Sequence, residues 1–232
     1  MENNQKNKIV VGHQPQYFPY IGIFNKILKS DKFLFVDSTK FVAKVWHNRT
    51  IIKDKKDKIF YLTIPVSFKN GQIIKDVKIV ENNWKVKHLK SIKNIYSSCE
   101  HFEEVFSVIE NMLLQNSKFL IDYTLLSMEL ILNKISYNKK NIFIQSEEKI
   151  YGRKNDLIIN ISKHFKSNNY LSGEGAKNYV DEDYLKKNNV SHKFNKFVHP
   201  EYKQLGNKFV KNLSVIDCIF NIGFQEFKKI IK

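Results

Sequence analysis

The chain has 232 residues, of which 42% are hydrophobic, and a formal net charge of +16 at pH 7. This composition excludes a disordered chain, and eight glycines with four prolines exclude collagen-like sequence. Two cysteines cannot form a disulfide framework, the start MENNQKNK lacks the apolar core of a secretion signal, and no apolar stretch is long enough to span a membrane. We expect a cytoplasmic protein of one domain, residues 1–232, without membrane insertion.

The first 36 residues predict a βαβ opening. Lys8–Gly12 is a short apolar run typical of a buried strand, and a loop follows that is shaped by Pro15 and Pro19. Apolar residues at helical spacing predict a helix over Tyr20–Ser30, and Phe33–Val36 predicts a second buried strand. Short connections between these elements favour a parallel strand pair.

The remaining pattern extends this opening into an α/β fold. We expect Ile59–Val66 and Ile73–Val80 to form a hairpin around a Lys-Asn-Gly turn. The predicted class is a three-layer, Rossmann-like, mostly parallel sheet with an antiparallel hairpin extension and a helical insertion at about 83–136. The other predicted elements are helices at Trp84–Ser97, Phe102–Leu114, Phe119–Ile135, Asp156–Phe165 and Ser214–Phe220, a strand at Ile142–Ile144, a turn at Tyr170–Gly175 and an extended stretch at Lys193–Val198.

Polar side chains follow both strands of the opening. His13 and Gln14 come directly after the first strand, and Asp37 follows the second. Because ligands of open α/β sheets bind outside the carboxyl ends of the strands, we expect these residues to share a crevice, with Tyr17 at its edge. The alternative is that His13 only caps or braces the loop.

Arginine is rare in this lysine-rich chain, where Arg49 and Arg153 are the only two arginines among 39 basic residues. A planar guanidinium grips carboxylate or phosphate in a way that lysine does not. Arg49, preceded by Trp46 and Asn48, is therefore a candidate anion ligand. A buried salt bridge to an aspartate is the alternative. The abundant lysines are read as a solvated surface, with a phosphate-bearing substrate and nucleic acid as lesser alternatives.

The sequence also resembles a known family. The segments that carry the resemblance are HQPQYFPYIGIFNK, SDKFLFVD, WHNRTII, YLSGEGA, YKQ and LSVID. In this order they are similar to the WbqC-like family, and the similarity covers nearly the full chain. Family members are associated with bacterial O-antigen and other surface-polysaccharide gene clusters. The positions matching this pattern that look like site residues are His13, Gln14, Tyr17, Lys26, Asp37, Asn48, Arg49, Ser172, Gly173, Tyr202, Gln204, Ser214 and Asp217.

The resemblance implies a role in making or modifying nucleotide-linked sugars, such as dTDP- or UDP-sugars. Our first hypothesis is a transferase that acts on a nucleotide-linked amino sugar by N-acyl transfer. The expected acyl donor is acyl-CoA or an acyl carrier, and no metal is expected. In this hypothesis His13 is the general base, because an attacking amine must lose a proton, and Asp37 orients it. Arg49 and Lys26 neutralise the diphosphate, while the predicted ring contacts and hydrogen bonds come from Tyr17, Trp46, Gln14 and Asn48.

Three other functions stay open. High positive charge suggests aminoacyl transfer that uses a tRNA or a carrier as partner. A histidine-containing loop between the first strand and its helix resembles nucleotidylyltransferases. A module that binds a glycan precursor without turnover is the third. The histidine spacing does not predict a zinc site, and Ser172 is not in a nucleophile-elbow pattern.

Overall fold

A computed structural model of the chain describes residues 8–232. Residues 1–7, on which the expectation of no secretion signal rests, lie outside the described residues. The chain divides into two compact units. The first unit contains residues 8–14, 24–38 and 138–198, and the second contains residues 15–23, 39–137 and 199–232. The single domain expected from chain length stays a prediction.

The first unit is built on a five-stranded, fully parallel sheet with the strand order β7-β2-β1-β8-β9. This sheet confirms the predicted α/β class and the parallel pairing of the first two strands. In that pair His13 lies opposite Phe35, so both strands end at the same level. The strands are β1 Ile9–His13, β2 Lys32–Phe35, β7 Ile142–Ile144, β8 Asn169–Ser172 and β9 Ser191–Phe194.

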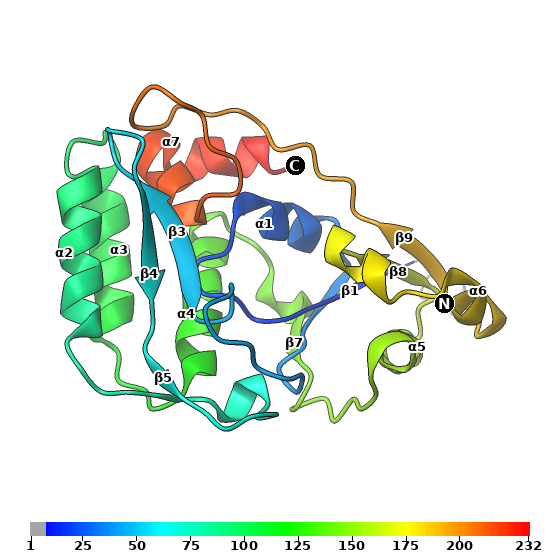
Figure 1. Cartoon of the computed structure of the whole chain (residues 1–232). Helices are drawn as coiled ribbons and strands as arrows, with labels where there is room; N and C mark the ends of the chain where they lie inside the picture. The colour runs from blue at the N-terminus through cyan, green and yellow to red at the C-terminus, as the bar shows by residue number, and fades with distance from the viewer. Residues whose placement is uncertain (1–7) are drawn as a thin grey trace. The chain divides into compact units, whose positions relative to one another are not determined.

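The strand order reverses direction between β1 and β8. From β1 the chain proceeds to β2 and β7 on one side, and then returns to place β8 and β9 on the other side. Such a reversal is the point at which open α/β sheets bind ligands. The connections contain α1 Ile21–Leu28, whose residues from Phe24 belong to the first unit, α5 Lys154–His164 and α6 Glu182–Lys187, and Figure 1 shows α5 and α6 near β8 and β9.

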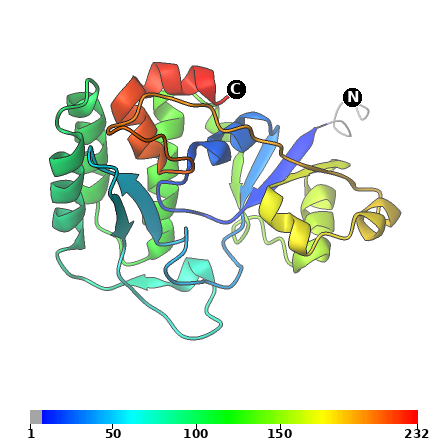
Figure 2. The same cartoon turned by 45° about the horizontal axis from the view of Figure 1, so that its top comes forward.

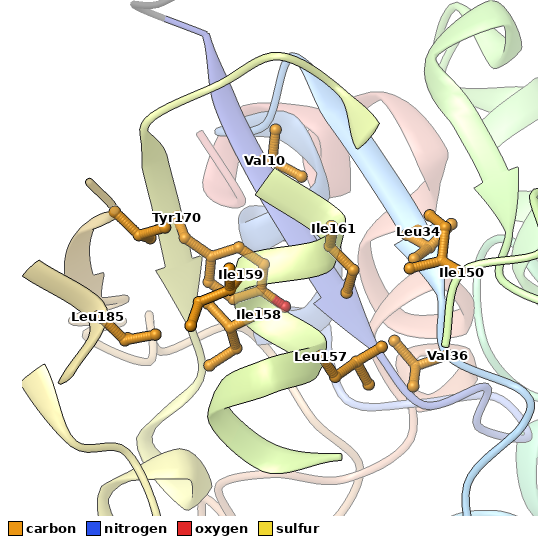
Figure 3. Packing of buried hydrophobic residues seen from close by; sticks show 11 residues of the cluster. Val10, Leu34, Val36, Ile150, Leu157, Ile158, Ile159, Ile161, Tyr170 and Leu185 are labelled. Atoms are coloured by element: carbon orange, nitrogen blue, oxygen red, sulfur yellow. The ribbon is translucent and has the colours of Figure 1, made fainter. Parts of the chain in front are cut away.

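One face of the sheet is packed against α5. The helix presents Leu157, Ile158 and Ile161 at helical spacing, and Figure 3 shows these side chains gathered with those of the strands. Because side chains alternate across a strand, Val10 and Tyr170 point to this face while their neighbours point to the other. The full cluster is Val10, Leu34, Val36, Ile150, Leu157, Ile158, Ile159, Ile161, Tyr170, Leu185 and Val190.

The second unit contains two antiparallel strand pairs and four helices. The pairs are β3 Arg49–Lys53 with β4 Ile59–Thr63, and β5 Val66–Ser67 with β6 Lys78–Ile79. Figure 2 shows α2 Trp84–Tyr96 and α3 Phe102–Leu114 side by side. The others are α4 Leu120–Lys134 and α7 Val215–Ile230. Short 3₁₀ turns span Ile74–Asp76 and, in the first unit, Lys139–Asn141 and Glu174–Asn178. No helix within residues 8–232 meets the length and hydropathy of a bilayer span.

Three predicted elements differ from the structure. The predicted hairpin of Ile59–Val66 with Ile73–Val80 is present only at its end, where Val66 pairs with Ile79. The partner of Ile59–Thr63 is Arg49–Lys53, and part of Ile73–Val80 forms a 3₁₀ turn. The predicted turn at Tyr170–Gly175 begins as a strand, because β1 and β9 supply hydrogen-bonding partners on both sides of it. The terminal helix extends to Ile230 across an interruption at Gly223, where φ is 73°.

A substitution at Gly12 in β1 tests how closely β1 packs against the side chains on the α5 side of the sheet. The Gly12 N–H donates to the Tyr170 hydroxyl at 3.0 Å, and an added Cβ would lie 2.5 Å from that oxygen. We expect Gly12→Ala to lower the free energy of unfolding by about 1–3 kcal/mol in urea denaturation. Gly175→Ala, where an added Cβ meets no atom within 4 Å, is the control and should be near neutral. An equal loss in both variants would contradict the prediction.

Candidate functional site

The candidate site of the first unit lies at the reversal point of the sheet. His13 is the last residue of β1, and Ser172 is the last residue of the adjacent strand β8, with Gly173 following it. Gly12 faces Tyr170 and the α5 side, so His13 points to the opposite face of the sheet. There it contacts Lys26 of α1. Four sequence-predicted residues thus come from the ends of two neighbouring strands and from one helix.

Lys26 and His13 form the central pair of this site. Lys26 Nζ lies 2.9 Å from His13 Nδ1, and the lysine is only 2% exposed. A Cβ added to Gly173 would lie 3.4 Å from Lys26 Nζ, so the glycine main chain forms one wall around the amine. The amine is therefore enclosed between a histidine ring and main chain.

Burial lowers the pKa of Lys26 from its usual 10.5 to about 7. The physical cause is desolvation, which disfavours the charged ammonium. Either nitrogen can be the donor in the hydrogen bond to His13, depending on which of them carries the proton. Two nitrogen bases in contact, one of which titrates near neutrality, form a pair that takes up or releases a proton at neutral pH.

Asp37 stabilises the neighbouring strand end. Its carboxylate accepts hydrogen bonds from the Ser146 hydroxyl at 2.6 Å, the Ser146 N–H at 3.0 Å and the Ser38 hydroxyl at 3.1 Å. These contacts tie the end of β2 to the segment that follows β7. His13 Nδ1 contacts Lys26. That Asp37 orients His13 is predicted from its position in the sequence, and it stays a prediction. Gln14 follows His13 and is half-buried.

A second polar group joins β8 to β9, and sequence reasoning missed it. His192 Nε2 lies 2.8 Å from the Ser172 hydroxyl, and His192 Nδ1 lies 3.7 Å from a Glu182 carboxylate oxygen. This order of groups occurs in nucleophilic serine sites. Here, however, Ser172 lies two residues after Tyr170 on β8, so its buried side chain points to the α5 side of the sheet, away from His13 and Lys26. We interpret the group as a buried support for the main chain at Gly173. Twenty residues separate its members, and no local motif marks them.

The remaining predicted residues belong to the second unit, beginning with the two aromatic candidates. Tyr17 is completely buried, and its hydroxyl lies 3.1 Å from His88 Nδ1. Burial lowers the pKa of His88 to about 4, so this imidazole is neutral at pH 7. A buried Tyr17 ring packs inside the unit and exposes no face for stacking on a ligand. Trp46 is 46% exposed and does offer such a face.

Arg49 and Asn48 are fixed by β4 and its surroundings. Arg49 Nε donates to the Thr63 hydroxyl at 3.0 Å, and its guanidinium carbon lies 4.5 Å from the centroid of the Tyr61 ring. These contacts replace the buried salt bridge that was the alternative for Arg49. The buried Asn48 side chain donates to the Ile64 carbonyl at 2.8 Å.

The last four candidates hold the C-terminal part of the second unit together. Tyr96 and Tyr202 each donate to one carboxylate oxygen of Asp217 at 2.9 Å. Burial nevertheless raises the pKa of Asp217 to about 6. Ser214 is the N-cap of α7, and the Gln204 side chain makes two hydrogen bonds with the main chain of Val210. Across residues 8–232 no cluster of three or more His, Cys, Asp or Glu side chains could hold a metal ion.

These features define an α/β protein with a basic pair at the carboxyl edge of a parallel sheet. Comparison with known proteins agrees with the sequence resemblance. The chain belongs to the WbqC-like protein family, whose family model matches residues 14–229, beginning directly after His13. It is 26% identical over 217 residues to the uncharacterized protein Rv1507c of Mycobacterium tuberculosis, and the alignment covers 91% of this chain and 93% of that protein. No solved structure matches the chain significantly.

The burial of Lys26 predicts a pH-dependent stability. Its pKa is about 7 in the folded chain and 10.5 when solvated, so the unfolded state binds more protons between these values and stability rises with pH through this window. We expect Lys26→Met to be more stable than the wild type by about 2 kcal/mol at pH 7, allowing for the lost hydrogen bond to His13. The difference should shrink as the pH approaches 10.

Urea denaturation at pH 7 and pH 9.5 measures this difference. Lys163→Met, at an exposed position of α5, serves as the control and should show no such pH-dependent gap. A gap between wild type and Lys26→Met that stays constant over this range would show that Lys26 is not held as a neutral amine.

Proposed function

We propose that this protein is a transferase that acylates the amine of a nucleotide-activated sugar in the synthesis of a bacterial surface polysaccharide. One observation carries the proposal: the buried amine of Lys26 lies 2.9 Å from His13 Nδ1 at the reversal point of the parallel sheet. A base that titrates near pH 7 is what the attack of an amine on an acyl group requires. The family resemblance supports the choice of substrate.

The chemistry follows from the pair. The sugar amine forms a C–N bond with the acyl carbon, and the bond between that carbon and the donor sulfur breaks. The attacking nitrogen loses one proton, which the neutral His13–Lys26 pair accepts. The departing thiolate of acyl-CoA or an acyl carrier then takes up that proton, so the pair returns to its neutral form. Because Lys26 is a neutral amine above about pH 7, the rate should rise with pH through this value.

The site is preorganised by the two buried groups that flank it. Asp37 holds the end of β2 and Ser172 holds the end of β8, each through hydrogen bonds with a neighbouring strand or segment. A catalytic pair needs such fixed surroundings, because small misplacements of reacting groups cost large factors in rate. All of these residues belong to the first unit.

A second candidate function is nucleotidylyl transfer. The specific observation in its favour is the combination of a strand order that reverses beside β1 with a histidine at the end of β1. It does not account for a buried lysine whose pKa is near neutrality, because phosphate nucleophiles are already ionised at pH 7. The acyl-transfer proposal explains that lysine and is therefore preferred.

Product formation tests the proposal. Purified protein is incubated with UDP- or dTDP-amino sugars and acetyl-CoA, and mass spectrometry detects the acylated sugar. We expect His13→Ala and Lys26→Met each to lower kcat by about 10²-fold or more. His164→Ala, which removes a partly exposed imidazole paired with Glu148 on the α5 side, is the matched control and should retain full activity.

Each alternative function predicts a different result when the purified protein is given the substrates of that function. Pyrophosphate released from a nucleoside triphosphate and a sugar phosphate would favour nucleotidylyl transfer. Turnover only with an aminoacyl-tRNA or a charged carrier would favour aminoacyl transfer, and sugar binding without any turnover would favour a binding module. Full activity in His13→Ala would refute the assigned base in every case.

A further inference from the structure

Next to the candidate site lies a hollow that the proposed mechanism does not use. On β8 and β9, Tyr170 and His192 are paired in register and belong to the α5 side, so Leu171 and Lys193 point to the opposite face. Here the first unit has a hollow of about 560 Å³. Its lining residues are Ile9, Lys29, Leu171, Lys193, Phe194, Asn195 and Lys196.

The charged residues that line this hollow are all basic. Three of its residues are lysines, and none of those that the structure describes there is acidic. By contrast, the hollow of about 530 Å³ beside α6 mixes Lys186 with Glu182 and Asp183. The position of the lysines around one concave surface therefore distinguishes this hollow from the generally lysine-rich exterior of the chain.

One of the three lysines is held in position. Lys29 Nζ donates to the Asn195 side-chain oxygen at 3.2 Å. Asn195 is 7% exposed, its amide nitrogen donates to the Asn25 side chain at 3.1 Å, and its backbone N–H donates to the Ser172 carbonyl at 2.8 Å. A buried, doubly anchored asparagine orients the ammonium and lowers the entropy that Lys29 would lose on binding a ligand.

Two features oppose an anion here. The carbonyl end of α1 carries about half a negative charge, and Asp31 accepts the Ile9 N–H at 2.8 Å at the edge of the hollow. The three positive charges of the lining lysines outweigh the negative charges of Asp31 and the carbonyl end of α1. The floor at Ile9 and Leu171 is apolar, so the hollow combines a charged rim with a surface suited to an uncharged ring.

We propose that this hollow binds the nucleoside diphosphate part of the activated sugar, with Lys29, Lys193 and Lys196 around the phosphates. The proposal rests on the proposed function and specifies where its substrate binds. Lys29 directly follows the last residue of α1, and its N–H donates to the Asn25 carbonyl at 3.1 Å, so it continues the helical turn. Lys26 and Lys29 are three residues apart, which places them on one side of this turn and about 4.5 Å apart along the helix axis. A sugar joined to a diphosphate at Lys29 therefore extends toward the Lys26–His13 pair.

Calorimetric titration with UDP and dTDP tests the hollow directly. We expect Lys29→Glu and Lys193→Glu each to weaken binding by about tenfold or more, because each puts a negative charge beside the phosphates. Lys163→Glu changes net charge equally on exposed α5 and should alter the affinity less than about twofold. All three positions are exposed, and thermal unfolding of each variant verifies its fold.

The outcomes separate this proposal from the proposed function. Equal weakening in Lys163→Glu would show attraction by overall charge and overturn the site, as would absence of binding by the wild type. Acyl transfer by a protein whose affinity is unaffected by Lys29→Glu and Lys193→Glu would overturn the hollow while leaving the transferase intact. Selective loss of binding without any turnover would support the hollow and contradict the transferase.

Discussion

The candidate site depends on the enclosure of one amine. Lys26 lies in the interior with its nitrogen 2.9 Å from His13, and burial lowers its pKa to about 7. An apolar side chain at this position would stabilise the fold better, because it would not have to give up a proton on folding. A position that lowers stability in this way supports the proposal that Lys26 takes part in a reaction, because residues at functional sites often cost stability.

The strand order of the sheet determines the surroundings of Lys26 and His13. The order reverses beside β1, so the neighbouring parallel strands β1 and β8 end at the same edge of the sheet, one followed in the chain by β2 and the other by β9. Polar groups then fix the edge on both sides: Asp37 joins β2 to the segment after β7, and Ser172 joins β8 to His192 of β9. In the second unit Asp217 plays a similar structural part between two tyrosines.

Elements with a strong local pattern could be predicted from the sequence. The helix Phe102–Leu114 and the strand Ile142–Ile144 have the predicted bounds, because apolar spacing and flanking polar residues mark each of them. Arg49–Lys53 was missed as a strand, and Asn169–Ser172 was predicted as part of a turn. Neither segment has a distinctive local pattern, and each is extended because a neighbouring strand completes its hydrogen bonds.

For the site, the sequence by itself determined that a histidine directly follows the apolar run of the first strand, because that run, a glycine and two prolines fix the strand and its loop locally. Only the tertiary structure decided which side chain meets it. Lys26 is thirteen residues from His13, and His192 is twenty from Ser172. Such pairs depend on strand order, register and the face to which each side chain points, and these are properties of chain segments far apart in sequence.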